Sequence, residues 1–215
     1  MLANFMREYN MNRVLLSATG LWPFQSKHVR NPLRTFCLLV EISSYPCQIL
    51  LLYDHWDDPQ LVFDGCYQLI LVTAFIARTL HDMWNYDRFR RLYIAIDEHW
   101  DIFTNDVEVS ILKDYSLLSR KFTKYYSTLI YLMLSVCIVV PLITPLLDIV
   151  VPLNESRSRQ FIIEVEFRVD RKDYFIPMFC YTTIVATVGI AIMVGVDAMH
   201  VICTAHACSL FAAVG

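Results

Sequence analysis

A long stretch without charge near the carboxyl end constrains the fold more than any other feature of the chain. The 22 residues from Phe175 to Val196 include no Asp, Glu, Lys or Arg. A helix rises about 1.5 Å per residue, so a run of this length matches the hydrocarbon thickness of a bilayer, about 30 Å. The sequence therefore predicts a membrane span over residues 175–200.

The composition agrees with a protein that crosses the membrane more than once. The chain is 56% hydrophobic and only 18% charged, and its mean hydropathy is +0.44. These values fit a polytopic membrane protein better than a soluble domain. The net charge of −3 argues against a nucleic-acid partner. Six of the seven cysteines lie in or beside apolar runs, where cysteine behaves as a small hydrophobe, so we expect no structural disulfide.

Three further apolar stretches are predicted to span the bilayer, over residues 33–53, 61–80 and 125–147. The first contains Glu41. Ionisable groups are costly in lipid, so Glu41 is either a functional residue or a structural partner of a neighbouring helix. The second span ends near Arg78, whose long side chain is expected to snorkel to the interface.

The remaining segments are predicted to lie outside the hydrocarbon. They are residues 1–32, 54–60, 81–124, 148–174 and 201–215. In the first of them Trp22 is expected at the membrane interface, where tryptophan is enriched. The segment 81–124 carries apolar residues at spacings of three and four, typical of an amphipathic helix. Asn105, followed by Glu108, then predicts the start of a helix that continues unbroken into the third span.

The segment 148–174 has two local signals. Asn154 begins an Asn-Glu-Ser sequon, which predicts N-glycosylation. Between Ile163 and Asp170, apolar and charged residues alternate with a period of two. This pattern predicts an extended segment with one apolar face.

The distribution of basic residues predicts the orientation. The tail through Arg34 holds five Lys and Arg residues, the stretch from Arg88 to Lys124 holds seven, and residues 54–60 hold none. The positive-inside rule therefore places the amino terminus and residues 81–124 in the cytoplasm. The segment 148–174 is then extracellular, although it holds five basic residues mixed with six acids.

No motif indicates an enzyme. The chain has no Gly-x-Ser-x-Gly elbow, phosphate-binding glycine loop or His-Glu-x-x-His pair, and no cofactor is expected. Cys203, His206 and Cys208 lie close together in sequence, but their spacing matches no common zinc pattern.

The outer halves of spans two, three and four supply aromatic, methionine and hydroxyl residues at one depth. Such a set suits a cavity for a small apolar molecule, and the alternative is ordinary helix packing in lipid. The candidate ligand-binding residues are Phe63, Tyr67, Val136, Val140, Met178, Tyr181, Thr182 and Val185.

Several short motifs, in their order and spacing, carry a family resemblance. They are Leu15-Leu16 with Gly20-Leu21-Trp22-Pro23; Pro152-Leu153-Asn154-Glu155-Ser156 with Glu166-Phe167, Asp170, Lys172 and Tyr174-Phe175; and Asp197 with His206, Cys208, Leu210 and Phe211. Together with the spacing of the four spans, they make the whole chain similar to the insect odorant receptors.

The resemblance implies a subunit of an odour-gated, non-selective cation channel in the plasma membrane of a sensory neuron. Family members are all-α polytopic bundles of seven spans with a cytoplasmic amino terminus, of which this chain holds four. They assemble as hetero-tetramers with an obligate odorant co-receptor. Small volatile ligands bind in an outer-half cavity formed partly by spans two, three and four, and the seventh span lines the pore.

The chain departs from that pattern at its carboxyl end. It stops at Gly215, before the last three spans and the pore, so we expect these residues with the co-receptor to carry no current. A fragment, an incomplete gene model and a truncated product are all compatible with this. The alternatives to an odorant receptor are a gustatory receptor, a structural membrane subunit, and a transporter, for which Glu41 and Asp197 are the candidates for ion coupling.

Overall fold

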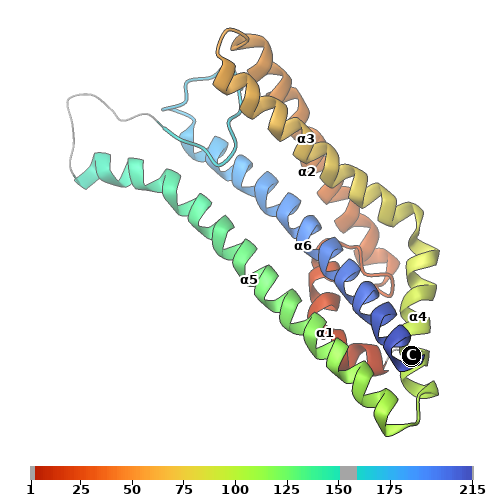
Figure 1. The fold of residues 1–215 in the computed structure, drawn as a ribbon. Helices are drawn as coiled ribbons and strands as arrows, with labels where there is room; N and C mark the ends of the chain where they lie inside the picture. Colours follow the sequence, from red (N-terminus) through yellow and green to blue (C-terminus); the bar gives the residue numbers. More distant parts are fainter. Residues whose placement is uncertain (1–2, 151–158, 215) are drawn as a thin grey trace. The chain divides into compact units, whose positions relative to one another are not determined.

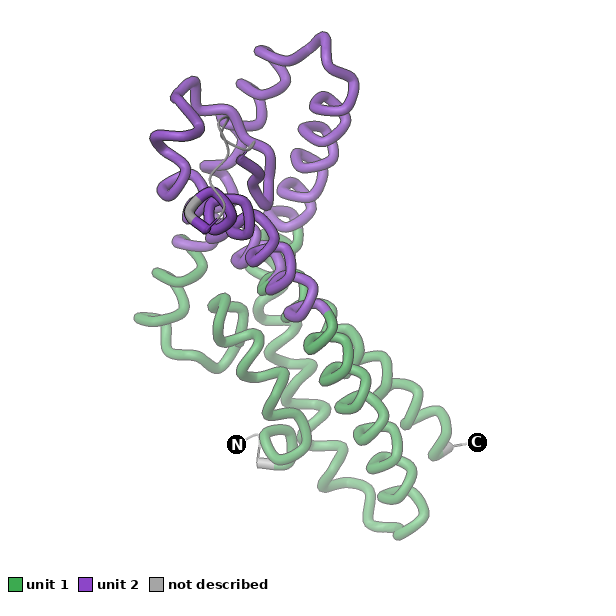
Figure 2. Tube along the Cα trace, turned by 90° about the vertical axis from the view of Figure 1, so that its left-hand side faces the viewer, with its two compact units in different colours: residues 1–35, 78–129, 191–215 green, residues 36–77, 130–190 purple. Residues whose placement is uncertain are grey.

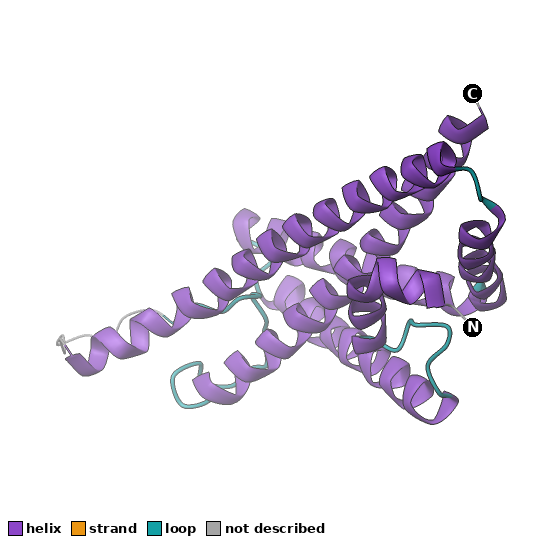
Figure 3. Cartoon of the chain, turned by 90° about the horizontal axis from the view of Figure 1, so that it is seen from below, coloured by secondary structure: helices purple, strands orange, loops and turns teal. Residues whose placement is uncertain are grey.

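Helices make up most of the chain. The computed structural model describes residues 3–150 and 159–214, and within those ranges it contains helices and loops but no strand (Figure 1, Figure 3). The helices are α1 (Ala3–Ala18), α2 (Lys27–Asp54), α3 (Pro59–Trp84), α4 (Tyr86–Ile102), α5 (Asp106–Val150) and α6 (Phe175–Val214). The predicted all-α class is confirmed.

Among the described residues, four helices are long and apolar enough to cross a membrane: α2, α3, α5 and α6. Each contains one of the predicted spans and extends beyond its predicted bounds. The longest, α5, has 45 residues. At about 1.5 Å per residue it is about 68 Å long, roughly twice the hydrocarbon thickness of a bilayer. Part of α5 therefore lies outside the hydrocarbon.

The start of α5 follows local capping chemistry. The side-chain oxygen of Asn105 accepts a hydrogen bond from the backbone N–H of Val107 at 3.2 Å, and Asp106 and Glu108 occupy the first turn. A cap and acids at a helix N-terminus satisfy free N–H groups and favour the helix dipole. The helix then runs without interruption through the third predicted span, as the sequence predicted.

The chain divides into two compact units, coloured separately in Figure 2. Unit 1 comprises residues 1–35, 78–129 and 191–215, and unit 2 comprises residues 36–77 and 130–190. The helices α1 and α4 lie wholly in unit 1, whereas each of the four long helices contributes residues to both units.

Aromatic rings form the core of unit 1 around α1 and α4. The Phe5 ring lies 4.9 Å from that of Tyr93 and 5.8 Å from that of Trp22, measured between centroids. All three residues are buried. The sequence-based placement of Trp22 at the lipid interface is therefore wrong. The reason is that the rings of Phe5 and Tyr93 cover the indole inside unit 1.

A tight turn at Gly20 connects α1 to α2. Gly20 has a positive φ of 73°, and a Cβ there would lie 2.8 Å from the carbonyl oxygen of Arg30. Arg34 closes the turn by donating from Nε to the Gly20 carbonyl at 2.6 Å. Only glycine fits this position without strain, so the Gly-Leu-Trp-Pro motif has a structural role here.

Candidate functional site

A buried apolar cluster in unit 2 joins the first turns of α6 to the segment that precedes it. Its members are Cys47, Phe161, Ile163, Val165, Phe175, Met178, Phe179 and Val185. The rings of Phe161 and Phe175 have centroids 5.5 Å apart. Ile163 and Val165 are buried, as the predicted alternation requires, whereas Val169 is 40% exposed. Arg168 has a positive φ of 53°, so the predicted extended conformation does not continue through it.

Polar groups lie at the edge of this cluster. The hydroxyl oxygens of Tyr181 on α6 and Ser43 on α2 are 3.0 Å apart, and the Phe167 ring meets the Tyr181 ring edge-on at 5.5 Å. Gln48 donates from Nε2 to the carbonyl oxygen of Glu164 at 3.0 Å. The arrangement is an apolar interior with a few oriented hydroxyl and amide groups, as in many small-molecule sites.

The four predicted site residues on α6 lie in or against this cluster. Met178 and Val185 are members, Tyr181 packs against it, and Thr182 is buried. The hydroxyl of Thr182 donates to the Phe179 carbonyl at 3.1 Å within the same helix. Tyr181 is therefore the predicted site residue whose polar group faces another helix.

The other predicted site residues do not belong to the cluster. On α3, Phe63 is 71% exposed and Tyr67 is 51% exposed. Val136 and Val140 lie on an exposed face of α5, beside a shallow apolar hollow of about 220 Å³. In a span, such faces contact lipid or another helix. The predicted glycosylation site, Asn154, lies outside the described residues.

Sequence reasoning missed the partners of the α6 residues. Ser43, Cys47 and Gln48 on α2 and Phe161 in the outer segment were not among the candidates, although they contact the α6 face or its neighbours. The period-two alternation after Phe161 was the available signal. It indicates which side of the segment is apolar, but not the helix against which that side packs.

Glu41 is a buried carboxyl inside unit 2. Its side chain is 1% exposed, and neither carboxyl oxygen has a hydrogen-bond partner among the described residues. A Cβ added at Gly189 on α6 would lie 3.2 Å from Glu41 Oε1 and 2.5 Å from the Phe75 ring. Glycine at 189 therefore lets three helices approach closely around this carboxyl. Placing an ionisable group inside a span costs free energy, so such a group is a functional candidate.

Asp197, the other candidate for ion coupling, is paired. Within unit 1, Arg78 on α3 donates from Nη1 to Asp197 Oδ1 at 2.7 Å, and the Tyr126 hydroxyl on α5 donates to Oδ2 at 2.7 Å. From the sequence, Arg78 was predicted to snorkel to the interface, and its ion pair with Asp197 was not predicted. Both carboxyl oxygens are engaged, so Asp197 is a structural anchor of α3, α5 and α6.

Charged side chains hold the segment before α6 to the carboxyl end of α2 and the loop that follows it. Arg168 donates to Asp54 through Nε at 2.8 Å and through Nη2 at 2.7 Å, which is a bidentate pair. Glu166 accepts from the Arg168 backbone N–H at 2.6 Å and lies 3.5 Å from the His55 ring. Burial alone would raise the pKa of Glu166, but these two hydrogen bonds, together with the charges of Arg171 and His55, outweigh it and hold the pKa below its ordinary value of 4.5.

We predict that acid loosens this segment. A carboxyl whose pKa is depressed by folding stabilises the folded state above its unfolded pKa, and this contribution is lost as the pH falls through the folded pKa. Below pH 4.5 the hydrogen-exchange protection of the Arg168 amide should therefore decrease. The variant Glu166→Gln should lower that protection about tenfold at neutral pH, since a hydrogen bond to a carboxylate contributes about 1.5 kcal/mol. Equal protection in Glu166→Gln and the unsubstituted chain would contradict this.

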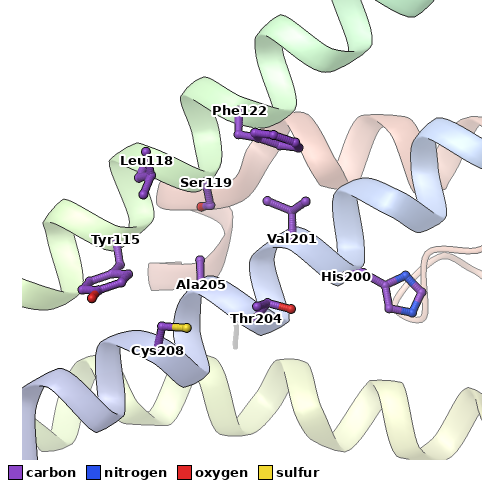
Figure 4. Close-up of a pocket in the computed structure, with 9 residues that line it drawn as sticks. All are labelled: Tyr115, Leu118, Ser119, Phe122, His200, Val201, Thr204, Ala205 and Cys208. Atoms are coloured by element: carbon purple, nitrogen blue, oxygen red, sulfur yellow. The ribbon is translucent and has the colours of Figure 1, made fainter.

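A larger apolar cavity lies in unit 1 between α5 and α6. It has a volume of about 450 Å³ and is lined by Tyr115, Leu118, Ser119, Phe122, His200, Val201, Thr204, Ala205 and Cys208 (Figure 4). Ser119 donates to the Ser116 carbonyl at 2.9 Å, and His200 Nδ1 lies 2.8 Å from the Val196 carbonyl. Both groups thus bond to a carbonyl of their own helix, and the hydroxyls of Tyr115 and Thr204 are the other oxygen groups in the lining.

Comparison with models of protein families, with curated proteins and with solved structures finds no significant match. The functional interpretation therefore depends on the residues themselves.

Proposed function

We propose that this chain is a receptor subunit that binds small apolar volatile molecules within the membrane, as the resemblance to insect odorant receptors implies. Complete and assembled with a co-receptor in the plasma membrane, such a subunit would gate a cation conductance. The ligand site is assigned to the outer part of unit 2. The larger cavity in unit 1 is not assigned this role because none of the predicted ligand-binding residues lines it.

The observation that carries the proposal is the cluster on α6 with the Tyr181 hydroxyl at its edge. Met178 supplies a flexible, polarisable wall, and aromatic rings surround it. The Tyr181 hydroxyl lies 3.0 Å from Ser43 Oγ and also bonds the Cys47 thiol. Ser43 donates its proton to the Val40 carbonyl at 2.7 Å, so Tyr181 donates to Ser43, and a ligand hydroxyl can join by donating to a free lone pair of either oxygen. The chemistry favours volatile alcohols, because they supply the donor that this pair can accept.

The test measures binding of linear alcohols of increasing length to the chain in lipid nanodiscs. We predict that Met178→Ala shifts the preferred alcohol to one with one or two more carbons, because removing the side chain makes room. Each added methylene that the site accommodates should strengthen binding about fourfold. Ile176→Ala is the matched control, since Ile176 lies on the same turn of α6 but is 63% exposed.

A second variant separates recognition from a general loss of structure. Tyr181→Phe removes only the hydroxyl and should weaken alcohols about fivefold relative to alkanes of equal length. The proposal is wrong if Met178→Ala and Ile176→Ala weaken every ligand equally. It is also wrong if no alcohol binds the unsubstituted chain.

The buried Glu41 favours a second candidate function, coupling of transport to an ion or proton. An unpaired carboxyl inside a bundle is typical of such coupling sites. The two candidates differ in the effect of Glu41→Gln, which keeps the shape of the side chain. A coupled transporter would lose the pH dependence of solute uptake, whereas a receptor would keep its alcohol selectivity.

A further inference from the structure

A second cavity in unit 1, between α1 and α5, is lined by basic side chains. Its volume is about 380 Å³. Its lining residues are Arg7, Glu8, Asn10, Met11, Leu117, Arg120, Lys121 and Lys124. Four cations and one carboxylate therefore face a single space, with two apolar side chains among them. This cavity plays no part in the proposed odorant site, which lies in unit 2.

The carboxylate neutralises only part of this charge. Glu8 accepts from Arg7 Nε at 2.9 Å through Oε1, and from Arg120 Nη1 at 3.4 Å through Oε2. No carboxylate of the described residues lies within ion-pair distance of Lys121 or Lys124, and both lysines are exposed. The cavity thus has a positive excess concentrated on the two lysines, and an anion is the chemistry that complements it.

The position of the lysines along α5 identifies the source of the anion. Lys124 is the last charged residue before the uncharged stretch from Tyr125 to Leu147. Both ammonium groups therefore lie where a helix leaves the hydrocarbon, at the depth of phospholipid headgroups. A free anion in water would not be restricted to this depth.

The apolar part of the wall supports the same source. Met11 on α1 lines the cavity and is exposed. Val14, one turn after Met11, is also exposed. Exposed apolar side chains beside cations match the glycerol and upper acyl carbons that adjoin a lipid phosphate. Inorganic phosphate would gain nothing from them.

We propose that the cavity between α1 and α5 binds the phosphate headgroup of an anionic phospholipid. Lys121 and Lys124 contact the phosphate, and Arg7 and Arg120, oriented by Glu8, form the back of the site. Basic pockets next to spans are recurrent sites for anionic headgroups in the cytoplasmic leaflet. The positive-inside orientation predicted for α1 and for residues 81–124 places the cavity at that leaflet.

The experiment measures binding of dioctanoyl phosphatidic acid to the purified full chain in a zwitterionic detergent. Each lysine near a lipid phosphate is expected to contribute about a fivefold gain in affinity. Lys121→Gln with Lys124→Gln should therefore weaken binding about 25-fold. Lys113→Gln is the matched control, since it removes the same charge from the same helix outside the cavity. It should change affinity less than twofold.

Two further probes identify the source of the anion. Dioctanoyl phosphatidylcholine, which has no net charge, should bind at least tenfold more weakly than phosphatidic acid. Inorganic phosphate at equal concentration should not displace the lipid. The thermal midpoint of each variant, measured without lipid, should match that of the unsubstituted chain, which keeps a change in affinity separate from misfolding.

Three outcomes would overturn the proposal. One is an equal loss of affinity in Lys113→Gln and in the double variant. Another is equal binding of phosphatidylcholine and phosphatidic acid. The third is displacement by inorganic phosphate at equal concentration, which would assign the cavity to a soluble anion.

Discussion

Replacing Asp197 by alanine is expected to lower the free energy of unfolding by about 2–4 kcal/mol. The change removes the acceptor shared by the Arg78 guanidinium, at 2.7 Å, and by the Tyr126 hydroxyl, also at 2.7 Å. Both donors are then left unpaired at the end of an uncharged span. An unpaired cation in such a place costs more than the ion pair itself contributes.

A double-mutant cycle distinguishes the pair from the general cost of changing a span. Asp197→Leu and Arg78→Leu should each destabilise the chain, but the double variant should be more stable than Asp197→Leu alone, because no unpaired charge remains. The measurement is the midpoint of unfolding in a titration with SDS. Asp173→Ala, which removes an exposed carboxylate before α6, is the control and should change stability by less than about 0.5 kcal/mol. Strict additivity of the two leucine variants would show that the ion pair has no energetic role.

The features that the sequence predicted well are those decided by neighbouring residues. Asn105 caps the helix that begins at Asp106 because its side chain reaches the N–H of Val107, two residues away. The uncharged run after Lys124 is likewise a local property. Such features need only the identity of adjacent residues and the geometry of one helix.

The features that the sequence did not predict depend on partners far along the chain. Arg78 and Asp197 are 119 residues apart, and nothing near either residue indicates the other. Trp22 is buried by Phe5 and Tyr93 through a fold that brings α1 against α4. A hydrophobic pattern shows which residues share a face of a helix, but not what that face contacts.

The predictions for the candidate site show the same difference between local features and features that depend on distant partners. Depth in the membrane follows from position along a span, and on that criterion Met178 and Phe63 are equivalent. Burial also depends on the rotation of each helix about its axis, and one residue changes that direction by about 100°. Met178 faces the cluster, whereas Phe63 is exposed. Depth alone therefore could not select the face of α3.

Replacing Gly189 by leucine is expected to destabilise unit 2 by about 3 kcal/mol. A Cβ at this position would lie 2.5 Å and 2.6 Å from two atoms of the Phe75 ring, well inside van der Waals contact. The same Cβ would lie 3.2 Å from Glu41 Oε1. The larger side chain must therefore separate α6 from α3 or force the Phe75 ring out of its rotamer.

A second glycine on α6 is the matched control. A Cβ at Gly195 would meet its nearest atom, the Leu15 carbonyl oxygen, at 3.6 Å, which is an ordinary contact. Gly195→Ala should leave stability unchanged or raise it by up to about 1 kcal/mol, since alanine favours the helix. Gly189→Ala should instead destabilise the chain by about 1–2 kcal/mol, because the steric cost exceeds that gain.

The close approach at Gly189 also links stability to the environment of Glu41. If the short distance between α6 and α3 excludes water from the carboxyl, separating the helices admits water. Gly189→Leu should then increase the reaction of Glu41 with a water-soluble carbodiimide, which modifies accessible carboxyls. Adding Phe75→Ala to Gly189→Leu should restore part of the lost stability, since it removes the ring that the new side chain meets. Loss of stability in Gly189→Leu that Phe75→Ala does not reduce would show that the contact with Phe75 is not its cause.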